Sequence, residues 1–257
     1  MFAASDFPTM EQLVKWPNWF GPEDSFYGFN KVAFITLLAM AIPVVLFMIA
    51  GSKYKRGLVP RGVQNVAEST IELVEKQIIA PTMGAEGMAF LPLLLSMFVF
   101  ILVGNLFSII PTAQFPGNAR MANPLVLALI VWVVYIVVGV KHHGPKYFLD
   151  AINPPGVPAA LKILVVPIEL ISVFIMRPFS LAIRLFANML AGHILLVTFA
   201  VLTIQTIQAG GLLYLVTPFP FLGLVLFTGF ELLVAVLQAY VFTLLTAVYV
   251  GSSIHIH

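Results

Sequence analysis

The run PFSLAIRLFANMLAGH, residues 178–193, places one arginine, Arg184, inside an apolar stretch of helix-forming residues. Asn188 follows one helical turn later, and His193 stands nine residues after Arg184. A charge in such a run costs about 2.5–3.5 kcal/mol on membrane-insertion scales, so it marks a functional site. Arginine does not lose its proton in proteins. Arg184 is therefore predicted to act as a fixed positive charge and not as a proton relay.

The composition around this run is that of an integral membrane protein. Of 257 residues, 60% are hydrophobic and 9% charged, and the mean hydropathy is +1.02. Soluble domains carry about 25% charged residues. The basic residues are scattered and form no stripe, which argues against nucleic-acid binding. The absence of cysteine excludes disulfides and cysteine-ligated metals.

The hydropathy pattern predicts an all-α polytopic membrane protein, a single membrane domain over residues 1–257. Residues 1–30 form a polar segment with neither a signal-peptide nor a transit-peptide pattern, and we expect it outside the membrane. The predicted elements are spans at 32–50, 89–110 and 124–140, an interfacial helix at 62–80, a long helix at 163–206 and a last helix at 211–250.

The helix at 62–80 is predicted to be amphipathic and too polar to cross the bilayer. Its apolar residues recur at helical spacing, opposite a stripe of glutamates. The apolar set is Val63, Val66, Ile71, Val74 and Ile78, and the acidic set is Glu68, Glu72 and Glu75. The helix lies either along the cytoplasmic face or against a soluble partner domain.

The distribution of basic residues predicts the orientation of the chain. With the N-terminus outside and the C-terminus in the cytoplasm, the outer loop between the second and third spans carries only Arg120. Basic residues are favoured in cytoplasmic loops. Those that fall on the cytoplasmic side are Lys53, Lys55, Arg56, Arg61, Lys141, Lys146 and Lys162.

The apolar run at 163–206 is too long for one upright span. Its roughly 44 residues would measure about 65 Å as a helix, against a hydrocarbon core of about 30 Å. The run is either a hairpin broken near Pro178 or one strongly tilted helix.

Polar residues inside these helices are the candidate pathway for an ion. Glu231 and Gln238 are nearly two turns apart and share a face. If Gln238 is level with Arg184 on an antiparallel helix, Glu231 is level with about residue 191, close in depth to His193. A His193–Glu231 pair could then handle protons. The remaining polar residues of the predicted set are Ser180, Asn188, Glu169 and Asn105.

Each of these residues also has a structural alternative. Arg184 could form an internal ion pair with Glu231 or Glu169. His193 could be a packed histidine, Gln238 could hydrogen-bond between helices, and Asn105 could serve packing. His142 and His143 lie in a loop and are expected to be solvated, so we predict no metal site there.

The sequence resembles subunit a of F-type ATP synthases. The blocks that carry the resemblance are SLAIRLFANMLAGH (180–193), ELLVAVLQAYVFTLLT (231–246), VPRGVQN (59–65) and NLFSIIP (105–111). The resemblance covers nearly everything after about residue 30. His193 and Glu231 are arranged as in mitochondrial and several bacterial members, whereas other bacterial members exchange them. Ser108 stands where some members carry an acidic residue.

The resemblance implies the stationary half of a rotary proton turbine. It implies that Arg184 faces the carboxylates of a c-subunit ring, and that Asn188, His193, Glu231 and Gln238 line aqueous half-channels. It further implies that residues 163–206 form one tilted helix, that peripheral-stalk b subunits and the rest of the complex are partners, and that the membrane is a bacterial cell membrane. A mitochondrial inner membrane is the alternative.

Two other functions compete with this one. A stand-alone proton-coupled transporter or channel would use Arg184 to bind an anionic substrate, and a structural scaffold would use it in an ion pair. We expect no cofactor besides the transported proton. Because no phosphate-binding glycine loop of the P-loop type is present, we expect no catalytic ATP site in this chain.

Overall fold

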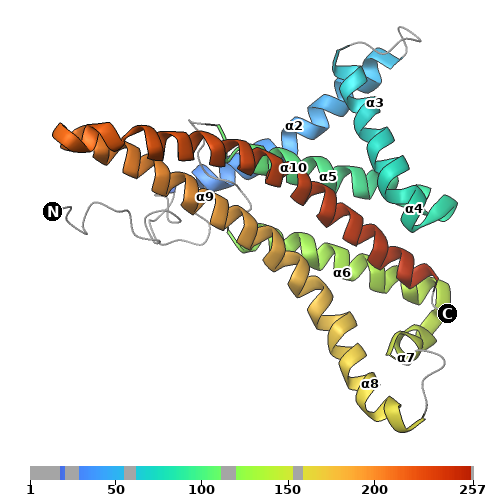
Figure 1. Cartoon of the computed structure of the whole chain (residues 1–257). Coiled ribbons are helices and arrows are strands. Elements are labelled where there is room, and N and C mark those ends of the chain that lie inside the picture. Colours follow the sequence, from blue (N-terminus) through green and yellow to red (C-terminus); the bar gives the residue numbers. More distant parts are fainter. Residues whose placement is uncertain (1–17, 21–28, 55–61, 111–119, 153–158, 256–257) are drawn as a thin grey trace. The chain divides into compact units, whose positions relative to one another are not determined.

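Helices make up nearly all of the described structure (Figure 1). The structure is a computed structural model that describes residues 18–20, 29–54, 62–110, 120–152 and 159–255. Five helical segments are long and apolar enough to cross a membrane, which confirms the all-α polytopic class. These segments are Lys31–Ser52, Gly84–Leu106, Ala122–Ile152, Leu161–Ala209 and Gly211–Ile254.

The element boundaries agree with the predicted spans to within a few residues. The α-helices are α2 (Lys31–Tyr54), α3 (Val63–Leu73), α4 (Ala80–Thr82), α5 (Leu91–Leu106), α6 (Ala122–His143), α7 (Tyr147–Ile152), α8 (Ala159–Ile171), α9 (Arg177–Ala209) and α10 (Pro218–Ile254). Short 3₁₀ segments are η3 (Gly84–Phe90), η5 (Gly144–Lys146) and η7 (Gly211–Val216), and π-helical segments are η2 (Val74–Ile79) and η6 (Ser172–Met176).

The long apolar run is one continuous helical segment. Helix α8 passes through the π-helical η6 into α9 without a break at Pro178. The hairpin alternative is therefore wrong, and the single helix implied by the resemblance is confirmed. The membrane-crossing segment of 49 residues measures about 74 Å at 1.5 Å per residue.

The amphipathic helix is also continuous, from Val63 to Thr82, but its predicted apolar stripe is divided. Val74 and Ile78 are fully buried, whereas Val66 is exposed. The buried face instead runs through Gln64, Ala67, Val74 and Ile78, at the three-, seven- and four-residue spacings of one helical face, so Val63 and Val66 lie beside it. On the exposed side Lys76 pairs with Glu72 at 2.5 Å and lowers the pKa of that carboxyl. That the amphipathic helix lies along the membrane surface stays a prediction.

The segment before α2 contains a short strand pair that the sequence analysis did not predict. Strands β1 (Asn18–Phe20) and β2 (Phe29–Asn30) are antiparallel, with Asn18 opposite Asn30. The Asn30 side-chain oxygen accepts a hydrogen bond from the Ala33 N–H at 3.0 Å. Asparagine is a favoured N-cap, so Asn30 stabilises the start of α2.

The described residues cluster into two compact units. Unit 1 draws on Met1–Ile42, Phe100–Arg120 and Phe186–Gln238, and unit 2 on Pro43–Val99, Met121–Leu185 and Ala239–His257. Helices α2, α5, α9 and α10 each contribute residues to both units. The single membrane domain stays a prediction.

In unit 2 the end of α6 is joined to the end of α10. The Tyr147 hydroxyl lies 3.1 Å from the Ser253 hydroxyl, and His143 Nε2 lies 3.0 Å from the Ile254 carbonyl oxygen. Tyr147 also packs on Gly139, where an added Cβ would lie 2.0 Å from the tyrosine ring. Glycine is required at position 139 because the aromatic ring occupies the space of a side chain.

Candidate functional site

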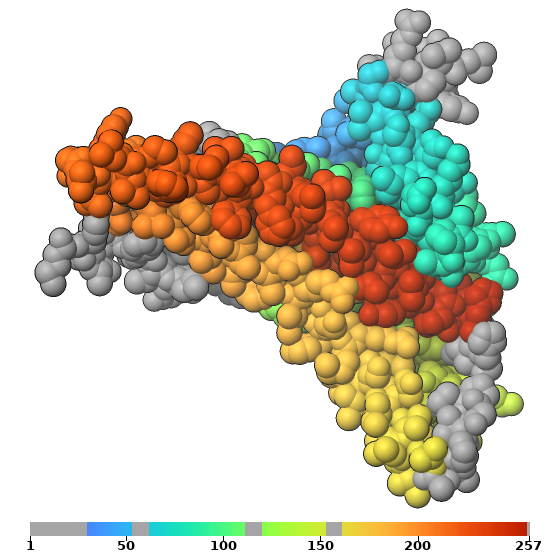
Figure 2. Space-filling view, viewed as in Figure 1, coloured from blue at the N-terminus to red at the C-terminus, as the bar shows by residue number. Residues whose placement is uncertain are grey.

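In unit 1, helices α9 and α10 lie side by side and antiparallel (Figures 1 and 2). The Phe199 and Phe227 rings stack with their centroids 5.0 Å apart. Gly223 permits this approach, because a Cβ there would lie 2.5 Å from the Phe199 ring. The close packing places the polar residues of the two helices opposite one another.

Asn188 and Gln238 form a hydrogen bond between the two helices. The Asn188 Nδ2 donates to Gln238 Oε1 at 2.8 Å, and Gln238 is 1% exposed. Gln238 Nε2 has no hydrogen-bond acceptor among the described residues. The interhelical bond considered in the sequence analysis is thus present, and the unused N–H leaves Gln238 able to bond water or a substrate group as well.

Glu231 is a buried carboxyl group of unit 1. It is 2% exposed, and neither carboxyl oxygen has a hydrogen-bond partner in the part of the chain that the structure describes. Gly192 faces it, since an added Cβ there would lie 3.3 Å from the Glu231 carboxyl carbon. Burying an isolated ionised carboxylate is costly. Glu231 therefore needs a proton, water or a partner, which suits a group that exchanges protons.

His193 directly follows the glycine that faces Glu231. Its side chain is 6% exposed, and the charge of Lys31 acts on it electrostatically. His193 and Glu231 do not hydrogen-bond to each other in the described structure, because neither Glu231 carboxyl oxygen has a hydrogen-bond partner there. Because Glu231 faces Gly192, the residue before His193, the two side chains lie at a similar depth along the helices, as the helical spacing predicts.

Helix α5 and the turn that follows it bring Asn105 and Ser108 to the same region of α10. The fully buried Asn105 donates from Nδ2 to the Ala235 carbonyl at 3.4 Å, about one turn from Glu231. The Ser108 hydroxyl lies near the Glu231 carboxyl but donates to the Asn105 carbonyl at 2.7 Å. No role was predicted for Ser108 from the sequence. Its position three residues after Asn105, close enough for the two to meet in one turn, was the available signal.

In unit 2, Arg184 is exposed and forms no ion pair within the described residues. Ser180, one turn earlier, is exposed as well. Glu169 is half-buried about four turns before Arg184 on the same continuous helix. An ion pair between Arg184 and Glu169, considered in the sequence analysis, is therefore absent from the described residues. The predicted pathway roles of all these residues stay predictions.

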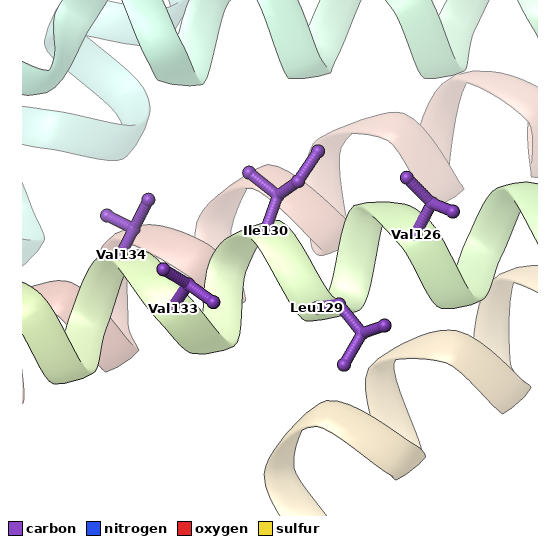
Figure 3. Close-up of a pocket in the computed structure, with 5 residues that line it drawn as sticks. All are labelled: Val126, Leu129, Ile130, Val133 and Val134. Carbon is purple, nitrogen blue, oxygen red and sulfur yellow. The ribbon is translucent and has the colours of Figure 1, made fainter.

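A groove of about 330 Å³ on α6 carries no comparable chemistry (Figure 3). Only aliphatic side chains line it, so it offers neither a charge nor a hydrogen bond to a ligand. The lining residues are Val126, Leu129, Ile130, Val133 and Val134.

A double-mutant cycle should detect the Asn188–Gln238 hydrogen bond. We expect a coupling free energy of unfolding of about 0.6 kcal/mol between Asn188→Ala and Gln238→Ala, because interhelical hydrogen bonds in membranes are modest. Unfolding of the purified chain in mixed micelles measures it. Thr198→Ala with Gln238→Ala is the control pair, because the Thr198 hydroxyl bonds only within its own helix, to Ile194. A coupling no larger than that of the control pair would contradict the bond.

Long apolar helices with buried amide, imidazole and carboxyl groups, and an exposed arginine, define a polytopic membrane protein of the ion-conducting class. Comparison with known proteins identifies the family. Residues 33–251 match the family described as ATP synthase A chain, and the chain belongs to this family.

Individual relatives agree with the family assignment. The chain is 40% identical to ATP synthase subunit a of Frankia alni, over 96% of this chain and 85% of the relative. It is 44% identical to ATP synthase subunit a of Rhodococcus erythropolis, over 89% of this chain and 84% of the relative. It is 41% identical to ATP synthase subunit a of Azorhizobium caulinodans, over 88% of this chain and 88% of the relative. With these bacterial relatives and its membrane-crossing helices, the chain is a bacterial membrane protein whose partner is the rest of an ATP synthase complex.

Proposed function

We propose that this chain is the stationary proton-conducting subunit of a rotary F-type ATP synthase. Two aqueous half-channels lead protons to and from carboxylates on a rotating c ring, and proton flow drives rotation and ATP synthesis. Each proton that crosses contributes about 2.3 kcal/mol per 100 mV of membrane potential. Several protons are therefore needed for each ATP.

The observation that carries the proposal is the exposed Arg184 without an ion pair among the described residues. A structural arginine in an apolar helix would be paired within its own chain. An unpaired, permanently charged arginine instead suits a surface that a carboxylate of another subunit passes. There it stabilises the ionised carboxylate and so releases its proton. The same charge keeps the two half-channels apart, because it repels a proton that would pass directly between them.

The buried groups of unit 1 supply the outer half of the pathway in this proposal. Glu231 lacks a fixed hydrogen-bond partner within the described residues, and His193 follows the glycine that faces it. A proton arriving from outside would be taken up in this region and passed, through water, toward Asn188 and Gln238. Ser180, Glu169 and Asn105 complete the polar set along the two paths.

The partners and the orientation belong to the same proposal. The c ring faces α9 and α10, and peripheral-stalk b subunits hold the chain stationary. The N-terminus lies outside and the C-terminus in the cytoplasm of a bacterial cell membrane. The excess of basic residues in the inner loops supports this orientation.

Reconstitution separates this function from that of a stand-alone transporter. Vesicles with the complete complex should make ATP when a potassium diffusion potential and a pH gradient are imposed. Vesicles with the purified chain alone should show no proton uptake above that of empty vesicles, because the ring that carries the proton between the half-channels is missing. Proton or anion transport by the purified chain would favour the transporter instead.

A further inference from the structure

The π-helical segment η6 runs directly into a proline that cannot donate to the carbonyl groups near the middle of η6. Within η6 the Arg177 N–H bonds to the Ser172 carbonyl, five residues earlier. The next residue, Pro178, has no N–H. It therefore donates neither to Phe174, four residues back, nor to Val173, five residues back. Carbonyl groups left unpaired inside a membrane protein are costly.

Two side chains of α6 donate to these same two carbonyls. The Tyr135 hydroxyl donates to the Val173 carbonyl at 2.6 Å, and the Trp132 Nε1 donates to the Phe174 carbonyl at 2.9 Å. Tyr135 and Trp132 are three residues apart, so they project from one face of α6. Tyr135 is fully buried and Val173 is 3% exposed, which excludes lipid and bulk water from this contact.

The same tyrosine contacts α10 and the arginine next to Pro178. The Tyr135 and Tyr249 rings meet edge to face with centroids 6.3 Å apart. The Arg177 guanidinium lies over the Tyr249 ring, 5.3 Å from its centroid, and donates to the Ser252 hydroxyl at 3.3 Å. The π-helical turn is thus held from both α6 and α10, with all of these residues inside unit 2.

The number of residues in this turn determines which way Arg184 points. A π-helical insertion accommodates one residue more than an α-helix of the same path. Returning the turn to α-helical geometry would rotate the following residues by about 100° relative to those before it. Arg184 follows η6 by about two turns within the same unit, on a face shared with the exposed residues Ser180 and Ile183. A rotation of this size would turn a buried face, that of Leu181 and Leu185, to the outside.

We propose that Tyr135 and Trp132 are positioning residues that hold the π-helical turn and thereby set the direction of Arg184. Neither side chain takes part in proton transfer. Each donates to a carbonyl of η6 that Pro178, having no N–H, does not serve. The functional consequence rests on the proposed role of Arg184, whereas the positioning itself concerns only this chain.

The test combines Tyr135→Phe with Trp132→Phe, which together remove both donors and keep two aromatic rings. The chain has no cysteine, so single cysteines at each position from 179 to 185 report the helix face cleanly. Their reaction rates with a small maleimide are measured on the purified full-length chain in detergent micelles, and proton-driven ATP synthesis is measured in the assembled complex. Tyr147→Phe is the matched control, because it also removes a buried hydroxyl in unit 2 but bonds Ser253 and not η6.

In the chain that keeps Tyr135 and Trp132, cysteines at positions 180 and 183 should react fast with the maleimide, and those at 181, 182 and 185 slowly. In the double variant this pattern should move by one position, and ATP synthesis should fall by about tenfold or more, as expected when a reacting group is misplaced. The control should keep both the pattern and the activity.

An unchanged labelling pattern in the double variant would overturn the positioning role. A shifted pattern with unchanged ATP synthesis would leave the positioning intact and count against the proposed function of Arg184. The two proposals therefore fail by different results.

Discussion

Replacing Arg184 with alanine should lower proton-driven ATP synthesis by about 100-fold, the size of effect seen when a preorganised charge is removed from a reacting centre. The side chain is exposed and has no ion pair among the described residues, so its loss leaves no buried carboxylate of this chain unpaired there. The complex should therefore assemble. Synthesis is measured in inverted vesicles under an imposed proton gradient, with assembly checked by purification of the complex.

Two further variants sharpen this result. Arg184→Lys keeps a positive charge but introduces a group that shifts its protonation readily when desolvated, so it should also lose most of the activity. Lys162→Ala removes a positive charge from the start of the same helical segment and should leave synthesis near normal. Normal rates with Arg184→Ala in assembled complexes would show that the proposed mechanism is wrong.

The second large effect is expected at Glu231. Glu231→Gln keeps the shape and removes the exchangeable proton, so proton-driven synthesis should fall by about tenfold or more, as when a proton-transferring group is removed. Assembly should be retained, because neither carboxyl oxygen has a hydrogen-bond partner among the described residues to be lost. Initial rates of ATP synthesis and of ATP-driven proton pumping both measure the change.

Glu86→Gln is the matched control for this prediction. Glu86 is an exposed carboxylate at the start of the second membrane-crossing segment, outside the polar set of α9 and α10. Its variant should keep both rates. If Glu231→Gln behaves like this control, Glu231 is a packing residue and the outer pathway follows other groups.

Most of the fold could be predicted from hydropathy, because a bilayer requires long apolar segments and satisfied backbone groups. The π-helical segments could not. Whether Ser172–Met176 becomes π-helical depends on donors that α6 brings from outside the segment, and periodicity within the segment carries no trace of them.

For the site, the sequence supports only a conditional placement: if Gln238 is level with Arg184, helical rise puts Glu231 near residue 191. In the structure Glu231 faces Gly192, but Gln238 bonds to Asn188, one turn after Arg184. The offset between antiparallel helices depends on how small residues such as Gly223 let them approach. A single sequence does not give that offset.

Arg184, exposed and without an ion pair in the described part of the chain, also bears on how the protein matures. A copy that reaches the membrane before its partners holds a permanent charge against lipid, at a cost of about 2.5–3.5 kcal/mol. In the proposed mechanism, assembly relieves that cost because a carboxylate of the c ring then meets the arginine. The feature that we assign to transport therefore also makes the orphan subunit less stable than the assembled one, and it links the lifetime of this chain to the supply of its neighbours.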